Sequence, residues 1–137
     1  MINILYDGIK YRIKGSRRVK YLIKKVIRCE KRIPGDLNFV ITNDKAIRNI
    51  NIKFLSRNYY TDVITFDYSK KKIVNGEVYI SIDTVRKNAL KYKVSLYSEL
   101  LRVIIHGTLH LCGYDDKTDD ERNIIRDKEE KWMKELD

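Results

Sequence analysis

The sequence predicts one α+β domain, a mixed α/β fold in which a small sheet of about four strands packs against about five helices. Three observations support this class. Short segments with apolar residues at every second position are interspersed irregularly with longer segments that repeat apolar residues every three or four positions. The chain has 137 residues, which suits one domain with its own core. It also contains no internal repeat, low-complexity tract or linker, so the domain is predicted to span residues 1–137.

The first alternating segment carries Ile9, Tyr11 and Ile13, separated by lysine and arginine. This period of two predicts a half-buried strand. Asp7 and Gly8 precede it and are interpreted as a turn that joins it to an earlier short strand.

A basic amphipathic helix is predicted over about residues 17–31, with Ser16 as its N-cap. Apolar residues recur at helical spacing along one face, and seven cations cover the other face. These cations are Arg17, Arg18, Lys20, Lys24, Lys25, Arg28 and Lys31. The helix is either a solvated surface or a platform for RNA, and Lys24, Lys25 and Arg28 are its candidate RNA contacts.

The middle of the chain is predicted to contain three strands and one helix. Pro34, in KRIPGD, is placed in a loop, and KKKIVNG is interpreted as a turn. Asn43 is expected to cap a helix that runs to about Leu55. In the helix, Ile47, Ile50 and Phe54 are predicted to face inward. In each strand, three apolar residues are predicted to share one face: Leu37, Phe39 and Ile41 in the first, Ile64, Phe66 and Tyr68 in the second, and Val78, Ile80 and Ile82 in the third.

The last third of the chain is predicted to be helical. A short helix runs to about Tyr92, and the most apolar helix of the chain runs from about Ser95 to Leu111. Thr118 and Glu121 form a capping box that begins a final helix. The apolar anchors of this helix are Ile125, Trp132 and Leu136. Its acidic residues are interpreted as surface.

The charge is strongly basic and unevenly distributed, with a net charge of +10. Residues 1–114 carry 23 basic against 9 acidic residues, whereas residues 115–137 carry 6 against 10. A basic body of this size attracts polyanions such as RNA through phosphate contacts. The alternative is a lysine-rich surface that is merely solvated.

The composition predicts a cytoplasmic protein that does not enter a membrane. No run of about 18 apolar residues is present, and the start, MINILYDGIKYR, lacks the layout of a secretion signal. The only cysteines, Cys29 and Cys112, do not form a disulfide-rich pattern, which indicates a reducing compartment.

Both histidines of the chain, His106 and His110, lie four residues apart in the most apolar predicted helix. This spacing places both imidazoles on one face, close enough to bind one ion. Gly113 allows the chain to reverse after the helix, so that Asp115 or Asp116 can supply a third ligand. Three protein ligands plus water is the pattern of catalytic zinc. The alternative is a pair of histidines that border the core and hydrogen-bond to the backbone.

The residues around the histidines limit the chemistry of such a metal. Zinc peptidases have a glutamate directly after the first histidine as general base, and Gly107 stands there instead. Cys112 would point away on a continuing helix and is interpreted as a buried small apolar residue. A metal with an open position still acidifies bound water and polarises a phosphoryl oxygen. Together with the basic surface, this favours phosphodiester hydrolysis.

The segment HGTLHLCGYDD, from His106 to Asp116, resembles the hallmark His-Gly-x-Leu-His-Leu-x-Gly-Tyr-Asp-His of the YbeY family of bacterial endoribonucleases and rRNA maturation factors. The segments NIKFLSRNYYTDVITF and GEVYIS resemble two further family segments, in family order. The resemblance implies a mixed α/β fold and one zinc ion per chain on His106, His110 and, by position, Asp116. It also implies cleavage of single-stranded RNA in 16S rRNA 3′-end maturation and ribosome quality control, with rRNA and the small ribosomal subunit as partners.

Two residues depart from the family pattern. Asp116 stands where the family has histidine, and its negative charge would make the bound water less acidic. Leu55 stands where the family has arginine; Arg57, two residues on, is either its replacement as a phosphate-binding cation or a solvated loop charge. Since the resemblance places the metal on Asp116, Asp115 is expected to orient the loop. Asp62 is interpreted as a turn or cap residue rather than a base.

Three functions therefore remain open on sequence. The first is a metal-dependent endoribonuclease that acts on rRNA. The second is an RNA-binding ribosome assembly factor in which the metal is structural. The third is a zinc peptidase, which the glycine after His106 and the absence of an export signal disfavour.

Overall fold

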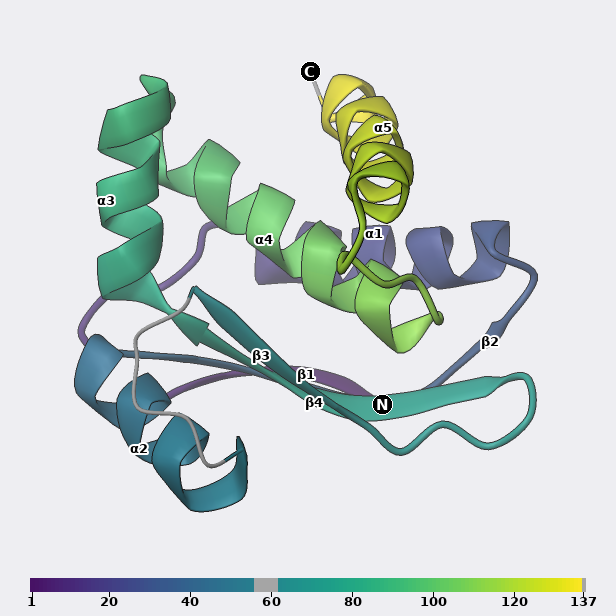
Figure 1. Ribbon diagram of the computed structural model, residues 1–137, viewed down its shortest axis with the longest axis horizontal. Helices are drawn as coiled ribbons and strands as arrows, with labels where there is room; N and C mark the ends of the chain where they lie inside the picture. Colours follow the sequence, from purple (N-terminus) through teal and green to yellow (C-terminus); the bar gives the residue numbers. More distant parts are fainter. Residues whose placement is uncertain (56–61, 137) are drawn as a thin grey trace.

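The computed structural model of the protein describes residues 1–55 and 62–136 and confirms the predicted α+β class (Figure 1). Within these ranges, one four-stranded sheet packs with five helices. The elements in chain order are β1 (Ile2–Tyr6), α1 (Ser16–Cys29), β2 (Ile33–Thr42), α2 (Asp44–Leu55), β3 (Val63–Asp67), β4 (Ile73–Ser81), α3 (Ile82–Tyr92), α4 (Leu96–Leu111) and α5 (Asp119–Glu135).

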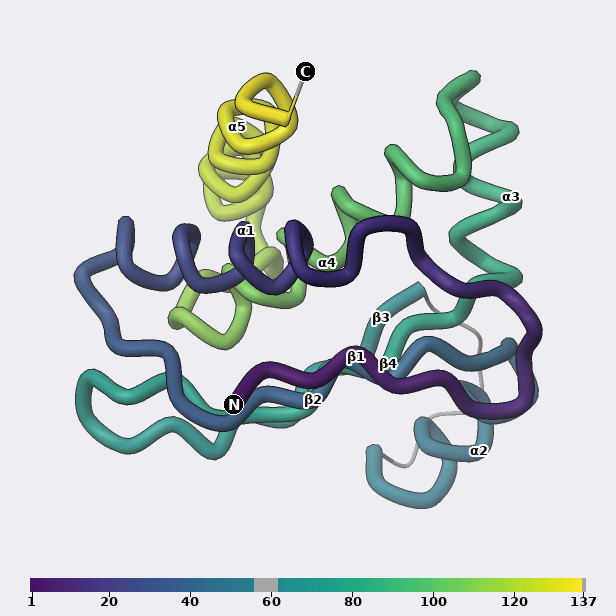
Figure 2. Tube along the Cα trace, turned by 180° about the vertical axis from the view of Figure 1, so that it is seen from behind, coloured from purple at the N-terminus to yellow at the C-terminus, as the bar shows by residue number. Residues whose placement is uncertain are grey.

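The sheet is mixed, with the strand order β1-β2-β4-β3. The pairs β1–β2 and β2–β4 are parallel, whereas β3 pairs antiparallel with β4 at one edge. Helices α1, α3, α4 and α5 lie on one side of the sheet and α2 lies on the other (Figures 1 and 2). None of the described helices is long and apolar enough to cross a membrane.

The core lies between the sheet and α4, which runs between the sheet and α5 (Figure 1). Because neighbours cover α4 on several sides, most of its residues are apolar, as expected for a largely buried helix. Leu100, Ile104 and Leu109 are fully buried. Four apolar strand residues of the predicted pattern are also fully buried: Phe39 and Ile41 in β2, and Val78 and Ile80 in β4. The helix that carries both histidines is therefore held rigidly.

The caps predicted for α2 and α5 are confirmed, and a further cap that was not predicted is present on α4. Asn43 Oδ1 accepts a hydrogen bond from the backbone N–H of Ala46 at the start of α2. Thr118 and Glu121 form the predicted capping box of α5. Ser95 caps α4. The prediction is wrong for α1, whose N-cap is Gly15 in a left-handed conformation (φ 63°) with no side-chain hydrogen bond. Ser16 is the first residue of this helix, which also ends earlier than predicted, at Cys29.

The strand predicted around Ile9, Tyr11 and Ile13 is not present. The N-terminal strand is β1 instead, and the residues after it connect β1 to α1 outside the sheet. Ile13 is still buried and the other two are partly buried. The alternating apolar residues therefore reflect a segment that packs one side against the core without pairing as a strand. The chain bends at Gly8, which has a positive φ of 68°, but this bend does not join two strands as predicted.

The loop predicted at Pro34 and the turn predicted for KKKIVNG are wrong in extent. β2 begins at Ile33 and β4 at Ile73, so both segments contribute to the sheet. An irregularity in the register between Pro34 and Leu37 accommodates the proline, which has no N–H for the ladder. Residues 70–72 form the turn itself, and Lys71 adopts a positive φ of 54°.

Two apolar positions of the predicted pattern are exposed: Phe54, which was predicted to face inward, and Tyr68, which was predicted to share a strand face with Ile64 and Phe66. Phe54 is 60% exposed and Tyr68 is 55% exposed. Phe54 lies on α2, on the less covered side of the sheet, where its ring contacts Phe66 edge-on at 5.9 Å between centroids. The core-facing residue of α2 is Ile47, which is fully buried.

Candidate metal centre

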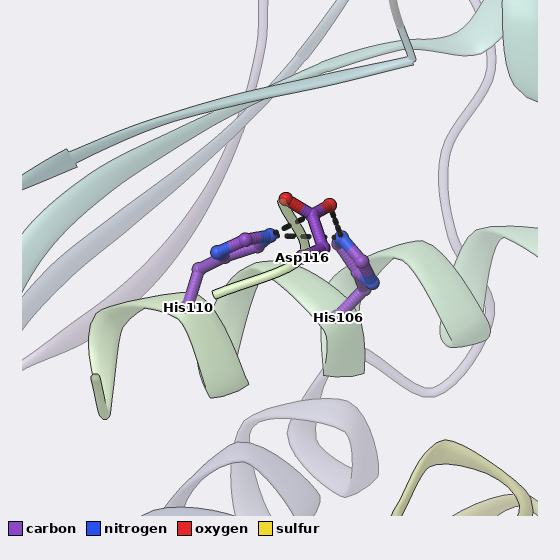
Figure 3. Close-up of side chains that lie close together, drawn as sticks. All are labelled: His106, His110 and Asp116. Carbon is purple, nitrogen blue, oxygen red and sulfur yellow. Dashed lines mark hydrogen bonds and ion pairs between the residues drawn. The ribbon is translucent and has the colours of Figure 1, made fainter. Parts of the chain in front are cut away.

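The last two turns of α4 place both histidines on the one face of this helix that is not packed in the core. Their side chains are 23% exposed for His106 and 18% exposed for His110. Gly113 then ends the helix with φ 107°, a conformation that favours glycine. The chain folds back after this turn, and Asp116 reaches the two imidazoles (Figure 3).

The three side chains converge on one point. His106 Nε2 and His110 Nε2 are 3.0 Å apart, and Asp116 Oδ2 lies 3.4 Å from the first and 3.3 Å from the second. A tetrahedral zinc with ligand bonds of about 2.0–2.2 Å requires ligand atoms about 3.3–3.6 Å apart. The observed triangle matches that spacing, slightly compressed between the two imidazoles. These three residues can therefore hold a metal ion without rearrangement of the backbone.

The loop that carries Asp116 is held from both sides. Asp115 Oδ1 accepts a hydrogen bond from the backbone N–H of Asp116 at 3.2 Å. Arg122 Nη1 donates to the carbonyl of Asp116 at 3.1 Å. The side chain of Asp116 nevertheless remains 42% exposed, so the cluster is open to solvent on this side. This openness suits a site that admits water and substrate rather than a closed structural site.

Glu129 of α5 completes the environment of His106. Its Oε2 lies 2.6 Å from His106 Nδ1, and the residue is only 7% exposed. A proton held on Nδ1 by this carboxylate leaves Nε2 as the free ligand atom, as in carboxylate–histidine–metal sites. Arg102 lies 3.6 Å from the other Glu129 oxygen and thus fixes the carboxylate.

The interpretation of the acidic residues of the last helix as surface is therefore wrong at Glu129. The sequence did contain a signal: Glu129 follows Ile125 by four residues and precedes Trp132 by three. It therefore occupies the buried stripe of α5. A carboxylate in an apolar stripe needs a buried partner, and that partner is His106.

Glu129 also changes the acidity of its partner. Burial lowers the pKa of His106, but the hydrogen bond to Glu129 and the negative charges of Glu129, Asp116 and Asp62 outweigh burial and raise the pKa above its ordinary value. Because only the neutral imidazole binds metal, protons compete with the metal at a higher pH than for an ordinary histidine.

We expect metal affinity to fall as the pH drops through the raised pKa of His106. In Glu129→Gln, the charge that raises this pKa is gone, so the fall should occur at a lower pH. At a pH well above the pKa of His106 in both proteins, the variant should bind metal roughly 10–100-fold more weakly because the ring is less well oriented and less basic. Metal titrations between pH 5 and 8 measure both effects.

The control is Glu130→Gln, since Glu130 also pairs with Arg102, at 2.7 Å, but does not contact His106. It should retain the wild-type affinity and pH profile. Identical titrations for wild type and Glu129→Gln would show that Glu129 does not act on the metal ligand.

Gly107 lies between the histidines in sequence but faces the sheet. A Cβ at this position would lie 2.8 Å from Cγ1 of Val78, which is buried and β-branched. Glycine therefore allows α4 to pack closely over β4. A glutamate in the position of the peptidase base would have to displace the helix, which agrees with the sequence argument against a peptidase.

Cys112 does not join the cluster. Within residues 1–55 and 62–136, the group of metal-binding side chains comprises His106, His110 and Asp116. Burial raises the pKa of the Cys112 thiol to about 11, so it remains protonated at neutral pH. This agrees with its interpretation as a small apolar residue.

The candidate RNA contacts lie apart from the metal cluster. Lys24, Lys25 and Arg28 are exposed on α1, and Lys25 Nζ pairs with Glu135 at 3.4 Å. Leu55 is the last residue of α2. Arg57 lies outside the described residues.

A solvent-open cluster of two histidines and a carboxylate, held on a rigid helix over a mixed sheet, defines the class of metal-dependent hydrolases. Residues 9–137 match the protein family described as Endoribonuclease YbeY, and the chain belongs to this family.

Relatives of known family support this membership over nearly the full chain. The Endoribonuclease YbeY of Karelsulcia muelleri is 42% identical over 133 residues, which cover 97% of this chain and 94% of the relative. That of Flavobacterium psychrophilum is 39% identical and covers 98% and 95%, respectively. The solution structure of TM1509 from Thermotoga maritima superposes with a TM-score of 0.68 at 32% identity, covering 99% of this chain and 89% of that one.

Proposed function

We propose that the protein is an endoribonuclease that uses one zinc ion per chain to hydrolyse phosphodiester bonds in single-stranded RNA. Its substrate in this proposal is the 3′ end of 16S rRNA, in small-subunit maturation and quality control. The observation that carries the proposal is the triangle of His106 Nε2, His110 Nε2 and Asp116 Oδ2, whose edges of 3.0, 3.4 and 3.3 Å are close to those of a tetrahedral site. Membership of the YbeY family supports RNA as the substrate class.

Each residue of the site has a distinct task in this proposal. His106, His110 and Asp116 hold the ion, which when bound acidifies water and withdraws charge from a phosphoryl oxygen. Glu129 keeps the Nδ1 proton of His106 in place. The exposed side of Asp116 leaves an approach for a flexible single strand. The packing of α4 between the sheet and α5 keeps both imidazoles in position.

The test compares metal-free protein, the same protein reloaded with zinc, and reloaded protein with excess chelator. Each is incubated with a single-stranded RNA that contains the 3′ region of 16S rRNA and with the same RNA annealed to its complement. We expect cleavage only by the reloaded protein and only of the single strand. Cleavage by metal-free protein at the same rate would contradict the proposal.

We further expect RNA binding to depend on the cationic face of α1. Reversal of Lys24, Lys25 and Arg28 to glutamate removes three candidate phosphate contacts and adds three repulsive charges. The RNA affinity should fall. The slope of log affinity against log salt concentration should become shallower by the amount expected for about three lost phosphate contacts. Fluorescence anisotropy at several salt concentrations measures both quantities.

The matched control reverses Arg126, Lys131 and Lys134, three exposed cations of α5. It makes the same change in net charge on another helix. If both triple variants lose affinity equally, only the total charge matters and α1 is a solvated surface.

A further inference from the structure

A small hollow of about 180 Å³ lies directly beside the metal cluster, with His106 in its wall. Asp62, Asn88, Tyr92, Glu99 and Glu129 also line it, and they come from α3, α4, α5 and the residue before β3. Its volume is below the ~300–1,000 Å³ of pockets that hold drug-sized molecules, so it fits a single ring system rather than a whole nucleotide. Because His106 belongs to both features, a ligand in this hollow would lie next to the bond being cut.

Glu99 is the unusual member of this wall. The residue is only 4% exposed. Within the described residues no fully buried side-chain oxygen lacks a hydrogen-bond partner, so the Glu99 carboxylate keeps its contact with solvent through the hollow that it lines. Burial raises the pKa of Glu99, and the charges of Asp62 and Glu129 reinforce this effect against Arg102. A ligand that fills the hollow would displace this solvent, so it would have to donate hydrogen bonds to Glu99 in place of water.

Two kinds of ligand do not fit this wall. A second metal ion needs converging ligand atoms, and among the described residues such convergence occurs at the His106–His110–Asp116 cluster, not at the carboxylates of the hollow. A phosphate would meet Asp62, Glu99 and Glu129, while the guanidinium of Arg102 is already paired with Glu129 and Glu130. The chemistry favours a ligand group that presents several N–H donors and carries no negative charge.

Building on the endoribonuclease function proposed above, we propose that this hollow is a subsite for a guanine base of the nucleotide next to the scissile phosphate. The Watson–Crick edge of guanine carries adjacent N1–H and N2–H donors, which match the two acceptors of the Glu99 carboxylate. Adenine and cytosine each place a ring acceptor beside their amino group, and uracil places carbonyl oxygens beside its N–H, so these bases face the carboxylate with at least one acceptor.

The aromatic ring of Tyr92 supports this assignment. It lines the same hollow and is 57% exposed, so its ring is available for contact with a base. Proteins that recognise single-stranded RNA commonly stack splayed-out bases on aromatic rings and bond their Watson–Crick edges. The site would thus select a base by its donors and hold it by its ring.

The first measurement does not require cleavage. Isotope-labelled, zinc-loaded protein is titrated with each of the four nucleoside monophosphates, followed by NMR; the shared phosphate cancels in the comparison. We expect GMP to bind about tenfold more tightly than the other three and to shift the amide signals of Asn88, Tyr92 and Glu99. Glu99→Gln, which replaces one acceptor by a donor, should abolish this preference.

Two further variants separate recognition from folding. Asp127→Asn removes an exposed carboxylate of α5 outside the hollow and should leave the GMP preference unchanged. Tyr92→Ala should weaken all four nucleotides by a similar factor and retain the preference. Equal affinity for the four nucleotides, or a preference that survives Glu99→Gln, would overturn the guanine subsite.

The second measurement maps cut sites in a randomised single-stranded RNA. Guanine should be enriched at one position beside the cut for wild type and lose this enrichment in Glu99→Gln. RNA cleavage without guanine bias overturns the subsite and leaves the nuclease function standing. Guanine-selective binding by a protein that cuts no RNA overturns the nuclease function and leaves the subsite standing.

Discussion

Replacement of both His106 and His110 by alanine is expected to lower the metal content from about one ion per chain to almost none. The two Nε2 atoms form one edge of the ligand triangle, and a single aspartate that is 42% exposed cannot retain a zinc ion through purification. Elemental analysis of protein purified without chelator measures the change. His106→Ala leaves Glu129 paired with Arg102 alone, so some stability is lost, but the apolar core around α4 is unchanged and the fold should persist, as circular dichroism would show.

Cys112→Ala is the control for this measurement. Cysteine is also a common metal ligand, and Cys112 lies only two residues after His110, but its thiol is outside the cluster. The variant should retain about one ion per chain. Full metal occupancy in the double histidine variant would place the ion elsewhere in the protein and would contradict the assigned centre.

The convergence of His106, His110 and Asp116 could be predicted from the sequence because short-range geometry determines most of it. Two histidines at a spacing of four on a helix must share a face. Gly113 adopts the positive φ that reverses the chain, and Asp116 follows only three residues later. No long-range packing had to be known to bring these ligands near one another, and the predicted cluster of His106, His110 and Asp116 is the one that the structure brings together.

The parts that could not be predicted depend on contacts between distant segments. Apolar residues alternate at Ile9, Tyr11 and Ile13 as regularly as in a strand. The segment that pairs with β2 is nevertheless β1, which precedes them in the chain. Glu129 lies 23 residues from His106, and only the packing of α5 on α4 joins them. Phe54 sits on a helix that lies on the other side of the sheet, so its apolar character did not imply burial.

Replacement of Asp116 by alanine is expected to abolish RNA cleavage while RNA affinity remains near that of wild type. The variant loses the third ligand, whereas the proposed RNA-binding cations lie on α1, away from the cluster. Loss of metal-supported catalysis costs several orders of magnitude in rate. If the metal is instead structural, the same variant should show a lower melting temperature, and weaker RNA binding should accompany it. Cleavage rate, affinity and melting temperature are therefore measured on one preparation.

Asp116→His keeps a third ligand at this position but replaces the carboxylate by a neutral imidazole. The control is Asp115→Ala, which removes the neighbouring carboxylate; that carboxylate contacts the loop backbone rather than the cluster. A neutral imidazole leaves more positive charge on the metal, so the coordinated water is more acidic than beside aspartate, and cleavage should equal or exceed that of wild type. Asp115→Ala should retain most of the cleavage. Loss of activity in Asp116→His with metal still bound would mean that the carboxylate does more than hold the ion. Equal cleavage by wild type and a folded, metal-free Asp116→Ala protein would show that the nuclease activity arises at another site.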